Sequence, residues 1–300
     1  MLQLKKNNVV ALRKSLQTIM QFKELIESGL NQQQACKITG LNSKSVHTYI
    51  KKYNINVINK FQRTLEIKHD YFNNIDTEGK AYLLGYIIGD GYIGKDNRLS
   101  FGSSIDDEEV IKFAQQEISK NSKLEFSNYQ QGAKFRKPQI KLRIKSKELC
   151  KTLSEKYSVH NNKTNDITFQ FDFNLIDEYL LKHFVRGFFD ADGSISFYVN
   201  KDRYFNFSFI FTSLNFCNQI GSIFYKYFDY VPVVNVVKSK NMNTYQLRFK
   251  CKDRNRRKRI EMIYDWFYKD SNIYLTRKKN KFELYLNTVL NSRYKNLESV

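Results

Sequence analysis

Two short stretches of the chain are apolar on nearly every side. Residues 83–91 read LLGYIIGDG and residues 185–193 read VRGFFDADG. In each stretch the third residue is Gly, the seventh is small, the eighth is Asp and the ninth is Gly. A helix without a polar side is expected to be buried all round. The pattern therefore predicts two buried helices, each ending at an Asp-Gly pair.

Both stretches are followed by segments in which apolar and polar residues alternate. The first copy continues with GYIG and RLSFGSS around a KDN turn, and the second with SISFYV and YFNFSFIFTS around an NKDR turn. Alternation with period two around Asp- and Asn-containing turns predicts β-hairpins. A helical pattern then follows each hairpin, EEVIKFAQQEI in the first copy and CNQIGSIFYKY in the second.

A further pair of similar strands lies later in each copy. Residues 139–147 read QIKLRIKSK and residues 245–252 read YQLRFKCK. Aligning Leu142 with Leu247 gives an offset of 105 (247 − 142), close to the 102 (193 − 91) of the two Asp-Gly stretches. Two anchors at nearly one offset predict an internal duplication. The predicted fold class is α+β, with tandem pseudo-symmetric αββαββα units whose antiparallel sheets form a saddle.

In these later strands one face is apolar and the other is polar. The polar-face residues are Gln139, Lys141, Arg143 and Lys145 in the first unit and Gln246, Arg248 and Lys250 in the second. Lysines on strands also protect the edges of ordinary sheets. Their presence in both units of a basic chain predicts instead a surface that binds DNA.

The N-terminal part of the chain has the pattern of a small helical module. Gly29 is expected to end a first helix, and QQQACKI predicts a short second helix with small residues at a close crossing. Gly40 then allows a sharp turn, and Ser43 is the predicted N-cap of a third helix.

This module resembles a helix-turn-helix. The resemblance implies that the third helix offers the following residues to DNA: Lys44, His47, Thr48, Lys51 and Lys52. A helical hairpin with a solvated polar face is the alternative. We expect residues 1–56 to form this module, 57–75 a linker, 76–180 the first larger unit and 181–300 the second.

Charge and composition narrow the choice of partner. The 300 residues include 50 Lys and Arg against 30 Asp and Glu, a formal net charge of +20. This excess favours a polyanion, because each neutralised phosphate releases condensed counterions. No apolar run approaches the roughly 20 residues of a transmembrane helix, so no membrane partner is expected. The 4 Cys residues show no CxxC pairing, which indicates reduced thiols in a cytoplasmic, nucleoid-associated protein, with an organelle as the alternative.

Small residues in the two buried helices are spaced at i, i+4. They are Gly85 and Gly89 in the first helix and Gly187 and Ala191 in the second. A stripe of small residues lets two backbones approach closely, so each helix is predicted to be the other's partner. The two units would then be related by a pseudo-twofold axis in one chain, which predicts a monomer.

The Asp-Gly pairs would end these helices side by side. Gly91 and Gly193 are expected to adopt the left-handed conformation that stops a helix. Asp90 and Asp192 would then lie adjacent in the last turns, where helix ends and like charge disfavour them. This predicts a cation between the carboxylates. Oxygen ligands favour Mg²⁺, or Mn²⁺, completed by water and substrate phosphate.

At these residues the chain resembles a LAGLIDADG homing endonuclease of the two-motif, single-chain type. The resemblance covers roughly residues 76–300 and implies magnesium-dependent double-strand cleavage of a long, nearly asymmetric DNA target. It implies that Asp90 and Asp192, at the eighth motif position, are catalytic and bind metal. Gly91 and Gly193 complete the proposed metal set. Asp190 receives no such role, because the first motif has Ile88 at that position.

The resemblance also implies a basic residue near the scissile phosphate late in each unit. The run HNNKT supplies Lys163 in the first unit. The run YLTRKKNKF supplies Lys278 in the second, with Arg277 and Lys279 as rivals. A lysine there would stabilise charge on the phosphate or orient an attacking water.

Two other functions stay open at this point. The same family implies intron maturases, which bind RNA, and a regulator class that keeps the fold and a helix-turn-helix without cleavage. The Asp at both eighth positions favours the nuclease. A phosphatase of the haloacid dehalogenase type, whose nucleophile loop DADGS resembles, is excluded because the sequence has no βαβ pattern.

Overall fold

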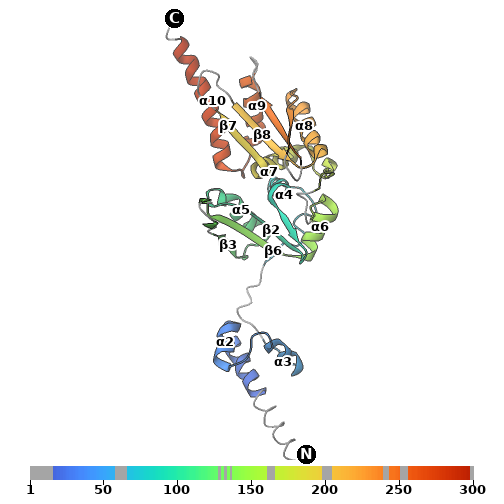
Figure 1. Ribbon diagram of the computed structural model, residues 1–300, viewed down its shortest axis with the longest axis vertical. Helices are drawn as coiled ribbons and strands as arrows, with labels where there is room; N and C mark the ends of the chain where they lie inside the picture. Colours follow the sequence, from blue (N-terminus) through green and yellow to red (C-terminus); the bar gives the residue numbers. More distant parts are fainter. Residues whose placement is uncertain are drawn as a thin grey trace, which may run out of the picture. The chain divides into compact units, whose positions relative to one another are not determined.

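The computed structural model describes residues 16–57, 66–127, 130–131, 134–135, 137–160, 166–197, 205–238, 243–250 and 256–297. The chain divides into two compact units, Met1–Thr64 and Leu65–Val300. Their buried apolar residues form separate clusters. Each unit is therefore described by itself (Figure 1).

The N-terminal unit is a group of short helices around a small core. Residues 16–28 are helical and are followed by α2 (Gln32–Thr39) and α3 (Val46–Lys52). The buried core residues are Phe22, Ile26, Ala35, Cys36 and Val46. Gly40 ends α2 in the left-handed region with φ of 68°, which a residue without a Cβ adopts at little cost.

The start of α3 differs from the prediction. Ser45, not Ser43, is the N-cap residue, and its side chain makes no capping hydrogen bond. The backbone N–H of Lys44 instead donates to Asn42 Oδ1 at 2.9 Å. Asn42 therefore organises the turn, because its short side chain reaches the backbone two residues on.

The second unit begins with a helix, two strands, a helix, two strands and a helix. These are α4 (Glu78–Asp90), β1 (Tyr92–Gly94), β2 (Arg98–Ser104), α5 (Glu108–Ile118), β3 (Leu124–Ser127), β6 (Gln139–Lys145) and α6 (Lys147–Tyr157). A small hairpin of β4 (Gln130–Gln131) and β5 (Lys134–Phe135) lies between β3 and β6. The antiparallel sheet has the order β1-β2-β6-β3.

The second half of this unit repeats the same order of elements. These are α7 (Leu181–Asp192), β7 (Gly193–Phe197), β8 (Phe205–Phe211), α8 (Leu214–Phe228), β9 (Val233–Val237), β10 (Thr244–Lys250) and α9 (Arg256–Tyr268), followed by α10 (Thr276–Leu297). The antiparallel order β7-β8-β10-β9 matches that of the first sheet. The predicted α+β class with tandem αββαββα units is confirmed. None of the described helices is long and apolar enough to cross a membrane.

Helices cover one face of each sheet. In β6, Ile140, Leu142 and Ile144 are buried while the residues between them are exposed or half-buried. In β8 and β10, the Phe207 and Phe249 rings stack with centroids 3.9 Å apart on the helix side. Helix α5 packs on β2 and β6, and α8 packs on β8 and β10. We call the opposite face of each sheet its open face. On that face the β6 residues are exposed or half-buried, whereas Asn206 and Ser208 of β8 are buried.

The two halves meet where α4 packs along α7. A Cβ on Gly85 would overlap the carbonyl oxygen of Phe184, and a Cβ on Gly187 would overlap that of Tyr82. Each of these pairs is the other shifted by 102 residues, so the two contacts are images about a pseudo-twofold axis. Only glycine lets the two backbones touch at both points.

The ends of α4 and α7 do not have the predicted left-handed glycines. Gly91 has φ −78° and ψ 152°, and Gly193 has φ −90° and ψ 156°, so both are extended. The chain passes straight from each helix into a strand. Glycine is required by space instead, because a Cβ on Gly91 would lie 2.5 Å from the Ile87 carbonyl oxygen and one on Gly193 would overlap Phe189.

Gly187→Ala is expected to destabilise the second unit by roughly 1–3 kcal/mol or more, because the added methyl overlaps backbone that cannot rotate away. Gly221→Ala in α8 is the matched control, since its Cβ would lie 3.7 Å from Leu247 and 3.8 Å from Pro232. That control is expected to be neutral or to stabilise by up to about 1 kcal/mol. Urea unfolding measures both, and equal effects would contradict the close helix contact.

Candidate active site

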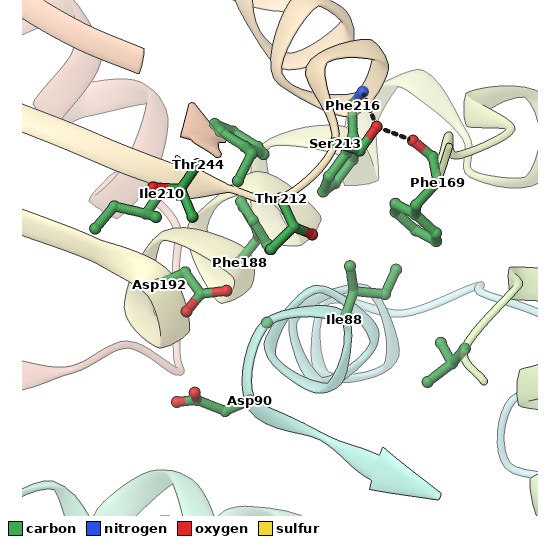
Figure 2. Close-up of a pocket in the computed structure, with 13 residues that line it drawn as sticks. Ile88, Asp90, Phe169, Phe188, Asp192, Ile210, Thr212, Ser213, Phe216 and Thr244 are labelled. Carbon is green, nitrogen blue, oxygen red and sulfur yellow. Dashed lines mark hydrogen bonds between the residues drawn. The ribbon is translucent and has the colours of Figure 1, made fainter. Parts of the chain in front are cut away.

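Asp90 and Asp192 line one cavity. They are the last residues of α4 and α7, so packing of the two helices brings them to the same place. A Cβ on Gly89 would lie 3.2 Å from Asp192 Oδ2, which puts that carboxylate against the residue before Asp90. Figure 2 shows both side chains at the cavity, whose volume is about 400 Å³.

Apolar side chains form most of the remaining wall. They are Ile88, Val159, Phe169, Phe188, Ile210, Phe211 and Phe216, and hydroxyls come from Thr212, Ser213 and Thr244. The Ser213 hydroxyl donates to the Phe169 carbonyl at 2.5 Å and accepts from the Phe216 N–H at 3.3 Å (Figure 2). Asp90 is exposed and Asp192 is half-buried, so solvent also reaches the two carboxylates.

The two carboxylates fit a hard divalent cation. Each stands at the partly negative end of a helix, so a cation bound between them would lower the energy of both. Among the described residues, no group of three or more His, Cys, Asp or Glu side chains is placed to hold a metal. Besides Asp90 and Asp192, such an ion would need carbonyl, water or phosphate oxygens, as Mg²⁺ commonly does.

Lys278 lies against the end of α7 and does not line the cavity. It is 2% exposed, and its Nζ donates to the carbonyl oxygens of Phe189, Asp190 and Gly193 at 2.5, 2.8 and 2.7 Å. Burial lowers the pKa of Lys278 to about 8, and the Asp190 carboxylate opposes that shift. Three acceptors match the three protons of an ammonium group. Lys278 thus closes the helix that carries Asp192, and its charge disfavours a metal on the Gly193 oxygen.

The rival basic residues also have partners. Arg277 Nε lies 2.7 Å from Asp107 Oδ1, and this hydrogen bond raises the pKa of Arg277. Lys279 Nζ lies 4.4 Å from the centroid of the Tyr274 ring. Lys163 lies outside the described residues. The described candidates for a phosphate-binding base therefore all contact protein groups in this structure.

The strand residues predicted to bind DNA lie on the open faces of the two sheets. Gln139, Arg143 and Lys145 are exposed, while Lys141, Gln246 and Arg248 are half-buried. Lys250 ends β10, opposite Asn206 in the register. Arg143 Nη1 lies 2.8 Å from Glu125 Oε2, so part of the charge of the first sheet is paired.

In the N-terminal unit, Val46 packs into the core and the basic side of α3 is exposed. The exposed residues include Lys44, His47, Thr48, Lys51 and Lys52. This leaves the side chains predicted to contact DNA on the surface of that unit.

A buried ion pair across the two halves was missed by the sequence reasoning. Arg186 is 0% exposed, and its Nη2 lies 2.8 Å from Glu78 Oε1 at the start of α4. Its Nη1 and Nε donate to the carbonyl oxygens of Phe267 and Ile273 at 2.5 and 3.0 Å. Glu78 Oε1 also accepts from the Asn272 N–H at 2.7 Å. The pair therefore ties both helices to the segment before α10.

A second polar pair crosses the same contact. The Tyr82 hydroxyl donates to Asp190 Oδ2 at 2.8 Å, and the Leu275 N–H donates to the same oxygen at 2.8 Å. Burial raises the pKa of Asp190. Asp190 thus holds the segment that leads to Lys278. The available signal was the pair of opposite charges, Arg186 and Asp190, four residues apart in the part of the motif that is otherwise apolar.

These polar pairs have no polar counterpart at the positions related to them by the pseudo-twofold axis. At the motif offset of 102, Glu78, Tyr82, Arg186 and Asp190 correspond to Leu180, Phe184, Leu84 and Ile88. Each cross-helix polar pair is thus replaced by an apolar pair. The fold is pseudo-symmetric, but its central contact is not.

No protein-family model matches the sequence, and no curated protein matches it. Among solved structures, the chain is similar to full-length DUF199/WhiA from Thermatoga maritima (14% identity, TM-score 0.41, covering 78% of this chain and 71% of that one). It is also similar to the LAGLIDADG homing endonuclease I-SmaMI bound to cleaved DNA (12%, 0.45, 74% and 92%) and to I-GzeII in complex with its DNA target (10%, 0.46, 72% and 92%). Such values assign neither a family nor an activity.

Glu78→Gln is expected to cost about 3 kcal/mol of unfolding free energy, because it leaves the buried Arg186 guanidinium uncompensated. Adding Arg186→Leu, the residue of the first motif, is expected to recover part of that loss. Glu155→Gln is the control, since its pair with Lys151 at 3.8 Å is exposed and contributes less than about 1 kcal/mol. Strictly additive losses in the double variant would argue against the ion pair.

Proposed function

We propose that this protein is a site-specific homing endonuclease that makes a metal-dependent double-strand break in a long DNA target. The observation that carries the proposal is the meeting of Asp90 and Asp192 at one cavity, at the C-terminal ends of two packed helices. The partly negative C-terminal end of a helix favours a cation beside each of these acids. A fold that places two of them there supports a metal-dependent reaction.

The sheets would hold the DNA. Their open faces lie on the two halves related by the pseudo-twofold axis, so one chain presents two similar surfaces to a duplex. The basic strand residues would neutralise phosphates and make binding salt-dependent. The exposed basic residues of α3 would add contacts from the N-terminal unit, and a monomer would suffice.

In this proposal Asp90 and Asp192 hold the ion. A bound Mg²⁺ or Mn²⁺ would polarise the scissile phosphate and lower the pKa of a water molecule. Lys278 would keep the end of α7 in place rather than touch DNA. Lys163 stays the proposed phosphate-facing lysine of the first half of the second unit. Gly91 stays the proposed backbone ligand of the metal ion.

The second candidate is a non-cleaving DNA-binding regulator, or a maturase that binds RNA. One observation favours it. The described basic side chains near the carboxylates, Arg277, Lys278 and Lys279, contact protein groups and do not line the cavity. A protein that only binds nucleic acid needs the sheets and not the cavity.

The deciding experiment incubates the full chain with Mg²⁺ or Mn²⁺ and with the DNA that flanks its own gene. The DNA is taken from the allele that lacks the intron carrying this gene. Double-strand cleavage at one site supports the nuclease. Tight binding to DNA that stays intact would leave the regulator, and preference for the matching RNA would leave the maturase.

Asp90→Asn and Asp192→Asn are each expected to lower cleavage by about a hundred-fold or more, because metal binding supplies several kcal/mol to the transition state. Binding should change little, since the sheets hold the DNA. With chelator the melting temperature should stay equal or rise, because an unfavourable charge is removed, and Mg²⁺ should stabilise the parent more than either variant. Asp265→Asn, exposed on α9, is the control. A clear loss of stability in chelator would make these acids structural.

Deleting residues 1–64 is expected to leave a chain that folds and cuts, because the two units have separate cores. Affinity for DNA should fall and depend less steeply on salt, since the basic residues of α3 are lost. Circular dichroism and binding at several salt concentrations measure both effects. An unfolded truncation would show that the first unit is needed by the second.

A further inference from the structure

The two sheets have the same strand order but different open faces. The register aligns the side chains of each face in rows across the strands. In the first sheet the rows are Ser104-Gln139-Ser127, Gly102-Lys141-Glu125, Tyr92-Ser100-Arg143 and Gly94-Arg98-Lys145. In the second they are Thr244-Val237, Ile210-Gln246-Asn235, Ser194-Ser208-Arg248-Val233 and Ser196-Asn206-Lys250.

The first open face is dominated by charge. Its two central rows on β6 are built on Lys141 and Arg143, which flank the carboxylate of Glu125. Its apolar content is a single ring, Tyr92, at the edge. Such a face suits phosphates and the guanine edge, where Arg and Lys reach O6 and N7.

The second open face is amide and aliphatic at the equivalent place. Gln246 stands where the first sheet has Lys141, and Asn235 is beside it on β9. Arg248 and Lys250 keep the basic residues found at Arg143 and Lys145, so the two faces differ at the Lys141 position and in the residues around it. Around these amides Ile210, Val233 and Val237 are 48%, 43% and 48% exposed. An apolar surface that covers these exposed aliphatic side chains would lower the free energy of the complex.

Hydrogen bonds between neighbouring residues of this face orient its polar side chains. Gln246 Nε2 donates to Ser208 Oγ at 3.2 Å, and Ser208 Oγ lies 3.0 Å from Ser194 Oγ. Ser208 is fully buried, so a buried neighbour on the same face holds the amide of Gln246. Its second N–H and its oxygen are the pair that an adenine edge requires, an N–H to N7 and an oxygen to the N6 amino group.

We propose that the second sheet reads A·T base pairs, with Gln246 and Asn235 on adenine and Ile210, Val233 and Val237 on thymine methyl groups. The first sheet, through Lys141 and Arg143, takes guanine and phosphate. This rests on the proposed function, because it assumes that both sheets enter the major groove of one duplex, which is wide enough for β-strands. The target is then chemically uneven, with its A·T pairs on the side of the second sheet.

The first test uses the unmodified full chain. Binding sites selected from a random duplex library are expected to contain a run of A·T pairs in one half and G·C pairs in the other. Replacing thymine by uracil in the A·T half removes only the methyl groups and is expected to weaken binding about ten-fold, within the range for one specific contact. The same replacement in the other half should have little effect.

The second test exchanges equivalent residues. Gln246→Lys is expected to change the preferred base pair in the A·T half from A to G and to steepen the dependence of log affinity on log salt by about one unit. Lys141→Gln is the converse and should act in the other half, flattening the slope by about one. The pair also shows which half of the target each sheet contacts.

Selected sites without an A·T half, or a uracil replacement that is neutral in both halves, would overturn the inference while leaving DNA cleavage untouched. A chain that binds no duplex DNA would instead overturn the proposed function, and the inference with it. The uracil replacement decides the inference whether or not the Gln246→Lys variant folds, because it uses the unmodified chain.

Discussion

The contact between the backbones of α4 and α7 fixes how the two halves of the second unit lie relative to each other. Gly85 lies on the Phe184 carbonyl and Gly187 on the Tyr82 carbonyl, so no side chain separates the two helices there. Because the helices are held at this distance, their last residues meet, and the strands that follow each helix start from one place. The carboxylates and the two sheets therefore inherit their geometry from two glycines.

Around this symmetric contact the protein is asymmetric in its chemistry. The polar pairs Glu78–Arg186 and Tyr82–Asp190 lie on one side only, and Lys278 closes α7 from the same side. The open faces differ as well, since an amide replaces a lysine at the equivalent position of the two sheets. One backbone plan thus carries two different surfaces.

The repeated architecture could be predicted from the sequence because its signals are local. The run EEVIKFAQQEI matches α5, Glu108–Ile118, end to end, and period-two alternation identifies the buried face of β6. The ion pair could not be predicted, because Glu78 and Arg186 are far apart in the chain and no periodicity joins them. The glycines at the helix ends were identified but explained wrongly, since a sequence does not say whether glycine serves conformation or space. The direction of Lys278 likewise depends on where α10 packs.

The ion pair also has a historical consequence. A dimer of two copies of the first half, α4 to α6, would place Glu78 opposite Leu84, with no guanidinium to meet it. A dimer of two copies of the second half, which begins at α7, would bury two copies of Arg186 against Leu180. Once these substitutions were fixed, a symmetric dimer of either half would have lacked the ion pair. The ion pair therefore makes each half depend on the other half of the same chain.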